Sequence, residues 1–576
     1  MAGTSQTALP PRTNTADDKP TADEQELLHR LSDMYDEGEG VRDQWRDPKD
    51  VERDLDLFRG DVGPAKKYMA ANFIEAFIDR MVAQLTDNRP IIRVEPYKAG
   101  LHAVARIMNK VVRGVWDESD MQRQAFKMAH LAASMSSAGL YTGYDPSRDE
   151  IDLEVLRQDQ VVTDPKVKEA GRLSRADYVF IKRIVALDEL KVRFPGRGAS
   201  IDADKRLSNL RSKKDGGART LVSPILDAAK SFFGQQRDPV VPRAEITECW
   251  VRDWQKGADG KALFPGGRLI IRGDDIVLWD GPNPYWDGQW PIDWYDWSVD
   301  PDHVWGRSET GRLRHLQLAF NQIGDGLVRN QLLSNVFTII ADFDAFPPEM
   351  WRKLQKMDDS LILRKQNRNA TVQPVPPPVF GADKLAIMKF MFTMAQLLAG
   401  VPDVTLGESP GSLQSGVAIE GLQESANLMT RARASRLEDF YKRVGQKLIA
   451  RILQFYTSDR VVGIAGPTAD SVAYAKARQE MFYEIINGKV EPIDPERRRR
   501  ALNDMRFTVS PGSSAPGSRI SRAKMMAELF MVGLVSGEDV LAAGDFPEPA
   551  EMIQRAQAER AKLTAAGIEP PRPAGK

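Results

Sequence analysis

Five side chains with oxygen or nitrogen donors crowd one short stretch of the sequence. They are Asp293, Asp296, Asp300, Asp302 and His303. Hard divalent cations prefer carboxylate oxygens, so this stretch could hold a metal ion. Its spacing matches no EF-hand loop, and an acidic loop in water before a helix explains the same residues. A metal-dependent hydrolase of nucleic acid or polysaccharide that uses Asp293, Asp296 and Asp300 is therefore kept as an alternative function.

Tryptophans concentrate in the same part of the chain. Eight of the 11 tryptophans lie between Ile246 and Trp305. We expect them to cover the faces of a β-rich core, as large aromatic side chains do. A platform on which bases or sugars stack is the alternative. Acidic residues such as Asp287 stand between these tryptophans and would repel phosphates, which disfavours nucleic-acid bases and leaves sugars open.

Other arrangements that carry chemistry are missing from the sequence. It contains no P-loop, no H-E-x-x-H pair and no G-x-S-x-G elbow, and its five histidines are scattered. The lone Cys249 is expected to be a packing residue. Four consecutive arginines, Arg497 to Arg500, could contact DNA, but Asp494 and Glu496 precede them, which favours a solvated helix face or a subunit contact. We predict no catalytic residue, no metal and no cofactor.

Composition narrows the class of protein further. A chain of 576 residues should divide into several folded regions. With 80 basic and 81 acidic residues the formal net charge is −1, so any contact with DNA should be local, weak or transient. No apolar run is long enough for a membrane span, and the N-terminus lacks the features of a signal peptide. A soluble product made in a reducing cytoplasm is expected.

The elements that would position a site form an unusual series. A helix should follow Gly306-Arg307-Ser308 and run to about Ser334, because Leu313, Leu316, Phe320, Ile323 and Leu327 recur at spacings of three and four. A polar insert at 336–379 contains strand-like runs at 337–340 and 361–363 and ends in prolines. A second helix at 381–399, a loop at 400–416 and a long helix at 417–456 complete the series.

The remaining elements are predicted from periodicity and turn signals. Helices are expected at 22–37, 69–86, 101–117, 120–138, 469–486, 520–534 and 548–565. Strands are expected at 91–94, 151–155, 161–162, 178–181, 461–464 and 506–510, with further β structure over 246–305. Residues 1–20 are expected to be disordered and residues 203–243 to form a flexible insertion.

Several segments, taken in order, resemble one known family. They are Asn72-Phe73-Ile74 through Leu85, Asn88 to Val94, Gly139-Leu140-Tyr141 leading into Asp152 to Val155, Val161 to Pro165, Trp305 to Ser308 with Gln317 and Asn321, Phe507 to Ser514, and Gly533 to Ser536. Together they resemble the portal (head–tail connector) proteins of tailed bacteriophages, of the short-tailed-phage type. The resemblance covers about residues 60 to 550.

The resemblance implies a fold and a division of the chain. The fold would be α+β and mainly α, with a wing, a two-helix stem, a clip and a helical crown, assembled as a ring. The implied regions are a tail at 1–20, an N-terminal wing at 21–306, stem helices at 307–335 and 380–400, the clip at 336–379, a channel loop at 401–415, a long helix and C-terminal wing at 416–515, and the crown and tail at 516–576.

The resemblance also implies a function. A dodecameric ring at one capsid vertex would let double-stranded DNA enter and leave, and would bind terminase, then head–tail adaptor or tail proteins, besides capsid and scaffolding proteins. The protein would be made in the host bacterial cytoplasm and end in the virion, without a membrane partner. The channel loop would present Glu408, Ser409, Ser412, Gln414 and Ser415. The clip would bind partners through Arg352, Lys353, Lys356, Arg364, Lys365 and Arg368.

Overall fold

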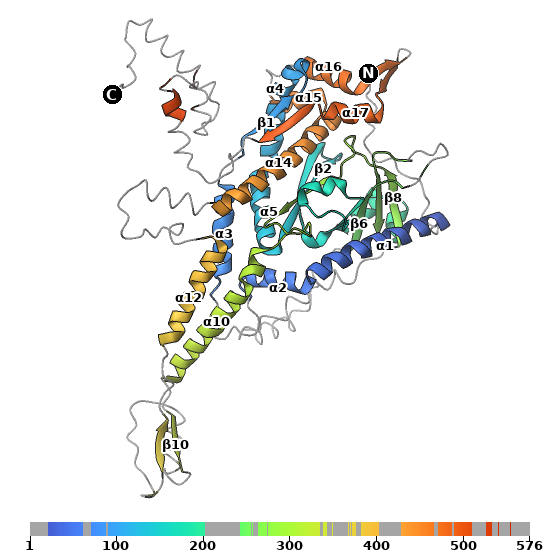
Figure 1. The fold of residues 1–576 in the computed structure, drawn as a ribbon. Helices are drawn as coiled ribbons and strands as arrows, with labels where there is room; N and C mark the ends of the chain where they lie inside the picture. Colours follow the sequence, from blue (N-terminus) through green and yellow to red (C-terminus); the bar gives the residue numbers. More distant parts are fainter. Residues whose placement is uncertain are drawn as a thin grey trace, which may run out of the picture.

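The computed structural model describes ten longer stretches of the chain. These are residues 21–61, 71–87, 90–201, 242–254, 263–273, 275–334, 382–401, 428–465, 471–486 and 489–509, with the short pieces 338–342, 371–375 and 526–530 and a few single residues. The fold is mixed α/β and mainly helical (Figure 1). The expected tail at 1–20, and the expected insertion up to residue 241, lie outside the described residues.

Four helices enclose the main core: α3 (Phe73–Thr86), α4 (His102–Glu118), α5 (Met121–Met135) and α14 (Leu428–Phe455). Helix α3 confirms the predicted periodicity, since its apolar residues at four-residue steps are all buried. The strand β1 (Ile92–Pro96) follows it and pairs antiparallel with β14 (Met505–Val509), as Ile92 opposite Val509 shows. The N-terminal and C-terminal parts of the chain therefore share one core.

Two antiparallel sheets lie beside this core. One has the order β4-β5-β6-β7-β8 and consists of Val161–Thr163, Tyr178–Ala186, Arg243–Val251, Arg268–Gly273 and Ile276–Pro282. The other has the order β3-β2-β9 and consists of Glu150–Arg157, Ser137–Asp145 and Ile292–Asp296. The β-rich character expected over 246–305 is confirmed.

One long N-terminal helix covers the five-stranded sheet. Helix α1 (Ala22–Trp45) begins at the capping residue Thr21, and its Leu27, Leu31 and Tyr35 pack on the buried side chains of the sheet, Cys249 among them. Burial raises the pKa of the Cys249 thiol to about 12, consistent with a packing residue. A helix here was predicted, but it is longer than expected, and α2 (Pro48–Phe58) behind it was not predicted at all.

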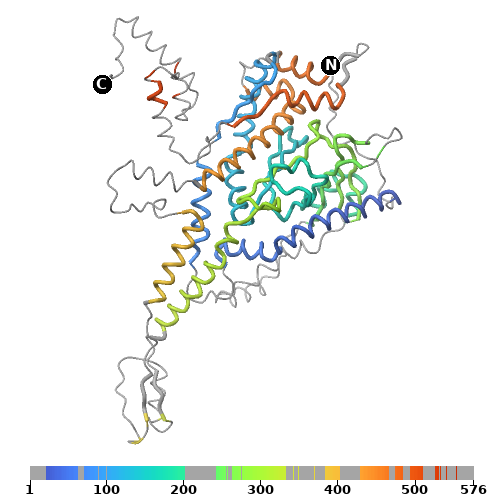
Figure 2. The backbone as a smooth tube through the Cα atoms, viewed as in Figure 1, coloured from blue at the N-terminus to red at the C-terminus, as the bar shows by residue number. Residues whose placement is uncertain are grey.

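Two helices leave the body together, as Figures 1 and 2 show. They are α10 (Glu309–Ser334) and α12 (Ala382–Ala399), close to the predicted bounds of both. Beyond them β10 (Thr338–Ala341) pairs antiparallel with β11 (Val372–Val375). Strand β10 was expected, whereas β11 was not, because it contains Pro374. A proline fits here because the hairpin has only edge strands.

Two sequence predictions near the C-terminal side are wrong. The strand expected at 461–464 is the helix α15 (Ser458–Ala465), since a short apolar run alone does not separate a buried strand from a helix. The helix expected at 469–486 ends earlier, as α16 (Ser471–Phe482), and gives way to the hairpin β12 (Tyr483–Ile486) and β13 (Lys489–Pro492). The next helix is α17 (Pro495–Leu502).

Candidate functional site

Helix α10 begins on a buried acid. The carboxylate of Glu309 is fully buried, accepts a hydrogen bond from Nε1 of Trp297 at 2.9 Å, and pairs with Arg433 of α14 at 2.9 Å. Burial lowers the pKa of Arg433, although Glu309 favours its charged form. An anion in the first turn stabilises a helix start. Glu309 therefore fixes where α10 begins and ties it to α14.

A second buried ion cluster joins α10 to α2. Asp54 is fully buried and pairs with Arg46, just after α1, and with Arg314 of α10, whose Nε donates to Asp54 at 2.6 Å. Arg46 also donates to the hydroxyl of Ser308 at 3.0 Å. Burial raises the pKa of Asp54, against the pull of both arginines. This cluster fixes the first turns of α10 against the corner between α1 and α2.

Two amide side chains of α10 hold the start of α3. Oε1 of Gln317 accepts the backbone N–H of Phe73 at 3.0 Å, and Oδ1 of Asn321 accepts that of Ala71 at 3.2 Å. The first N–H groups of a helix have no partner within the helix, so Gln317 satisfies that of Phe73, while Asn321 holds the residue before the cap. The capping residue Asn72 adds a bond from Glu75 N at 3.3 Å. Segments noted separately in the sequence thus form one junction.

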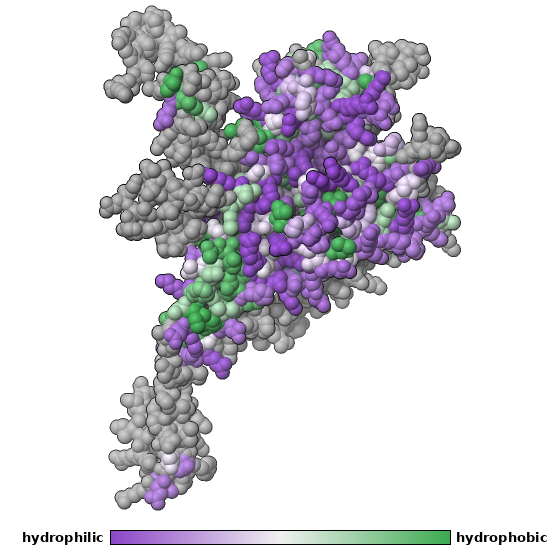
Figure 3. Space-filling model, viewed as in Figure 1, coloured by the Kyte–Doolittle hydropathy of each residue, from purple (hydrophilic) through white to green (hydrophobic). Residues whose placement is uncertain are grey.

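Helix α12 carries apolar side chains along its length that nothing described covers. Phe392 packs on Phe73 and Phe77 with ring centroids 6.0 and 5.7 Å apart. Other side chains remain in solvent, above all Phe390 at 64% and Leu397 at 68% exposure. With them we define the α12 face as Leu385, Ile387, Phe390, Leu397 and Leu398. Figure 3 shows an apolar band over this region of the molecule, and contiguous bands of this kind mark interaction surfaces.

The acidic stretch expected as an alternative metal site does not converge on one point. Asp293 and Asp296 lie three residues apart on β9, so their side chains point to opposite faces. Asp293 pairs with Lys447 at 2.9 Å, and Asp300 pairs with Arg307 at 2.9 Å. Burial alone would raise the pKa of Asp300. The hydrogen bond from the backbone N–H of Asp302 and the guanidinium of Arg307 lower it instead.

Histidine, cysteine and carboxylate side chains also occur elsewhere in the described stretches. Nowhere within them do three or more gather in a way that could hold a metal ion. The oxygens of Asp293 and Asp300 are engaged by cations of the protein itself. The structure therefore does not support the hydrolase alternative.

The tryptophans between residues 246 and 305 form core rather than a binding platform. Trp250, Trp290, Trp294 and Trp297 are at most 1% exposed. Trp294 meets Trp305 edge to face, with ring centroids 5.2 Å apart. Stacking of a base or sugar needs an exposed ring face, which these side chains lack. The core interpretation of this segment is confirmed, and the sugar platform is not supported.

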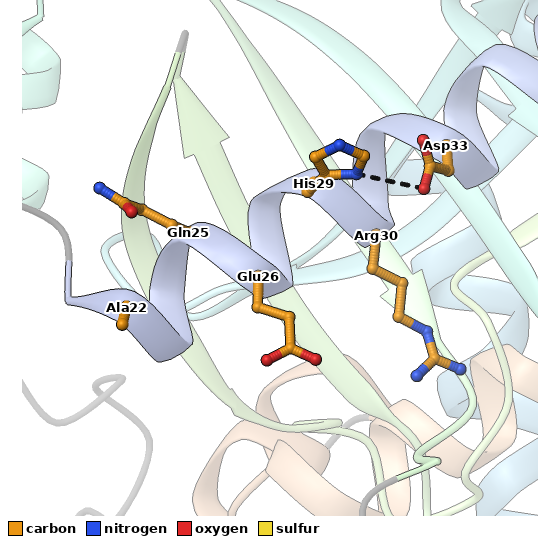
Figure 4. A pocket seen from close by; sticks show the side chains of 6 residues that line it. All are labelled: Ala22, Gln25, Glu26, His29, Arg30 and Asp33. Atoms are coloured by element: carbon orange, nitrogen blue, oxygen red, sulfur yellow. Dashed lines mark hydrogen bonds and ion pairs between the residues drawn. The ribbon is translucent and has the colours of Figure 1, made fainter.

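A surface hollow lies along one side of α1 (Figure 4). Its lining residues are Ala22, Gln25, Glu26, His29, Arg30 and Asp33. His29 Nδ1 lies 3.2 Å from a carboxylate oxygen of Asp33, and the guanidinium of Arg30 lies 4.1 Å from the ring centroid of Trp254. All six residues come from one helix and mix acidic with basic groups. This arrangement does not favour any ligand class.

The residues predicted to face a channel or to bind partners lie outside the described residues. They are Glu408, Ser409, Ser412, Gln414 and Ser415 of the loop and Arg352, Lys353, Lys356, Arg364, Lys365 and Arg368 of the insert. Their roles stay predictions. What the sequence did not predict is the set of buried contacts that anchors α10, because its members come from elements far apart in the chain.

Comparison with known proteins gives one family. The model of the phage P22-like portal protein family matches residues 28–277 and 330–575, which is most of the chain. No curated protein matches the sequence. Among the helices that the structure describes, none is both long enough and apolar enough to cross a membrane.

Proposed function

The chain belongs to the family of phage P22-like portal proteins, and from this premise we propose that its copies form a dodecameric ring at one vertex of a bacteriophage capsid. The family is structural, and we propose that this protein has no enzymatic activity of its own. The uncovered α12 face is the observation that best supports assembly into a ring. A helix that is apolar on nearly every side needs covering on nearly every side.

A ring supplies that cover. In a head-to-tail interface the α12 face of one copy would contact a different surface of the next, and the series closes after a fixed number of copies. We assign α10 and α12 to the stem, 336–379 to the clip, 401–415 to the channel loop, 21–306 with 416–515 to the wing, and 516–576 to the crown and tail. The buried anchors at Glu309 and Asp54 would then hold the stem rigidly on the wing.

Double-stranded DNA would pass along the axis of this ring during packaging and ejection. The loop residues Glu408, Ser409, Ser412, Gln414 and Ser415 include no lysine or arginine. Fixed contacts to phosphates would add friction and salt-dependent affinity, so a loop without cations suits DNA that must slide. Replacing Ser412 and Gln414 with lysine should slow packaging while rings still form, and unchanged packaging would contradict the assignment of this loop.

Partners would bind at the two ends of the ring. Terminase would supply the energy of packaging and would dock on the basic clip residues, Arg352 to Arg368, which tail or adaptor proteins would contact afterwards. Capsid and scaffolding proteins would surround the wing. The protein would thus be made in the cytoplasm of the host bacterium and be found in the virion.

The assembled state tests the proposal. Purified protein should show rings with a central hole in negative stain and a matching mass by sedimentation. Phe390→Asp and Leu397→Asp place charges on the α12 face and should shift the protein to monomers that keep their circular dichroism spectrum. The control Val192→Asp changes a side chain that is 82% exposed on α6 (Leu187–Arg193) and should leave rings intact. Wild-type protein that stays monomeric at every concentration would overturn the ring.

A further inference from the structure

Helix α17 carries two arginines, Arg498 and Arg499, that form no ion pair within the described stretches. The carboxylate of Asp494 caps the helix by accepting the N–H of Glu496 at 3.1 Å, and Glu496 pairs with Arg500 at 3.4 Å. Asp287, on the facing turn, pairs with Arg451 at 2.9 Å. Asp494 and Glu496 precede the arginine run, yet within the described stretches neither Arg498 nor Arg499 forms an ion pair with them.

The guanidinium of Arg498 lies over an aromatic ring. Its guanidinium carbon is 4.9 Å from the ring centroid of Trp286, and its buried Nε has no hydrogen-bond partner. Burial lowers its pKa, although Tyr483 and Asp494 favour the charged form. The side chain is half-buried, so its charge is only partly solvated. An anion placed beside it would recover the interaction that water no longer supplies.

Arg499 lies against backbone rather than against an acid. A Cβ atom at Gly288, which has a φ of +63°, would stand 2.9 Å from Nη2 of Arg499, and one at Gly266 would stand 3.6 Å away. The glycines leave room for the guanidinium, and its Nε is also buried without a partner. Burial lowers the pKa of the nearby Arg252, and the charge of Arg499 lowers it further, although Asp177 favours the charged form. Like charges are thus held close together.

We propose that Arg498 and Arg499, with the nearby Arg252, bind the phosphate groups of double-stranded DNA outside the channel. The planar fork of a guanidinium matches phosphate oxygens in geometry and charge. Helix α17 lies at the opposite end of the molecule from the free ends of α10 and α12, so this site is distinct from the stem (Figure 1). A patch of this size also agrees with a net charge of −1, which allows only local contacts with DNA. The inference rests on the proposed function only in choosing DNA as the source of phosphate.

Binding of a short fluorescent DNA duplex tests this site. Affinity is measured by anisotropy over a series of salt concentrations, for wild type and for the double variant Arg498→Gln/Arg499→Gln. Each phosphate contact contributes about 0.9 to the slope of log K against log salt, so the double variant should flatten that slope by about 2 and weaken binding about tenfold. Arg498→Lys/Arg499→Lys keeps both charges and should keep most of the slope.

The matched control removes two exposed arginines elsewhere. Arg123→Gln/Arg148→Gln changes side chains that are 85% and 77% exposed, with the same loss of charge, and should alter duplex affinity by less than about twofold. A folded Arg498→Gln/Arg499→Gln variant with unchanged affinity and slope overturns the site. So does a variant that loses its rings but binds duplex normally, because the arginines would then contact a neighbouring copy. Wild-type protein without rings contradicts the proposed function alone, since the duplex comparison can still be made.

Discussion

The ammonium group of Lys447 lies 2.9 Å from a carboxylate oxygen of Asp293, and the side chains keep only 3% and 7% of their surface exposed. The pair joins α14 to β9. Nζ of Lys447 also donates to the backbone carbonyl of Ile292 at 2.7 Å. Burial lowers the pKa of Lys447, while Asp293 favours its charged form. An aspartate that the sequence offered as a metal ligand is therefore the counter-ion of a buried lysine.

Breaking this pair should destabilise the protein strongly. Among the described residues, Lys447→Met leaves the buried Asp293 with Arg443, 3.8 Å away, as its remaining ion-pair partner. A buried charge that loses its partner costs about 3–5 kcal/mol, so we expect a loss of that size in the free energy of unfolding. Urea unfolding followed by circular dichroism measures it. The double variant Lys447→Met/Asp293→Leu removes both charges and should lose much less than the sum of the single variants. Additive losses would mean that the two residues are not coupled.

The cluster at Asp54 allows a comparison within one helix. Asp54→Asn leaves Arg46 and Arg314 facing a neutral side chain in a buried site, with Asp50, 3.2 Å from Arg314, as the remaining acid, so we expect a loss of about 3 kcal/mol. Asp56→Asn is the same substitution two residues along α2, where the pair with Arg59 spans 3.8 Å and is exposed. That control should change stability by less than about 0.5 kcal/mol. Equal melting temperatures for the two variants would show that the buried cluster does not stabilise the fold.

Sequence reasoning predicted the parts of this fold that one local pattern determines. The four-residue steps of α3 and the alternation of Ile151, Leu153 and Val155 each reflect a single buried face. Strand β2 was missed because it is buried on both faces, so its side chains do not alternate between apolar and polar. Helix α15 was missed because four apolar residues fit either structure.

The contacts that anchor α10 could not be predicted from the sequence for a different reason. Glu309 meets Arg433, and Gln317 meets Phe73, only after elements far apart in the chain have packed together. No spacing within the sequence encodes those pairs. The resemblance to a family marked Gln317 and Asn321 as features, but only the structure assigns them the backbone of residues 71–74 as partner.

Buried tyrosines should make the protein sensitive to alkali. Burial raises the pKa of Tyr474 to about 12 and those of Tyr295 and Tyr441 well above their usual range. Above pH 10 the unfolded chain loses these protons while the folded chain keeps them, so stability is full below pH 10 and falls as pH rises. The lowered pKa of Lys447 makes its contribution to stability rise with pH, but Lys447 is one group against three tyrosines.

Melting temperature and tyrosinate absorbance measured together from pH 8 to 12 check this expectation. The melting temperature should fall above pH 10, and absorbance at 295 nm should rise with unfolding rather than before it. Full ionisation of the tyrosines in protein that is still folded would contradict the burial of these hydroxyls.

Two helical glycines should respond in opposite directions to the same change. A Cβ atom at Gly445 of α14 would overlap the ring of Phe507, which is 2% exposed and stacks on Trp116 with centroids 6.1 Å apart. Gly445→Ala should therefore cost about 1–3 kcal/mol, as overpacked cores do. A Cβ at Gly463 of α15 would meet nothing within 4 Å, so Gly463→Ala should stabilise by about 0.5–1 kcal/mol through helix propensity.

Adding Phe507→Leu should restore part of the stability lost in Gly445→Ala, because the smaller side chain leaves room for the new methyl group. Urea unfolding of the variants measures both effects against wild type. Stabilisation by Gly445→Ala, to the extent seen for Gly463→Ala, would mean that α14 and β14 do not approach as closely as the structure shows. Close approach at Gly445 is what lets one strand from each end of the chain, β1 and β14, pack beneath the long helix.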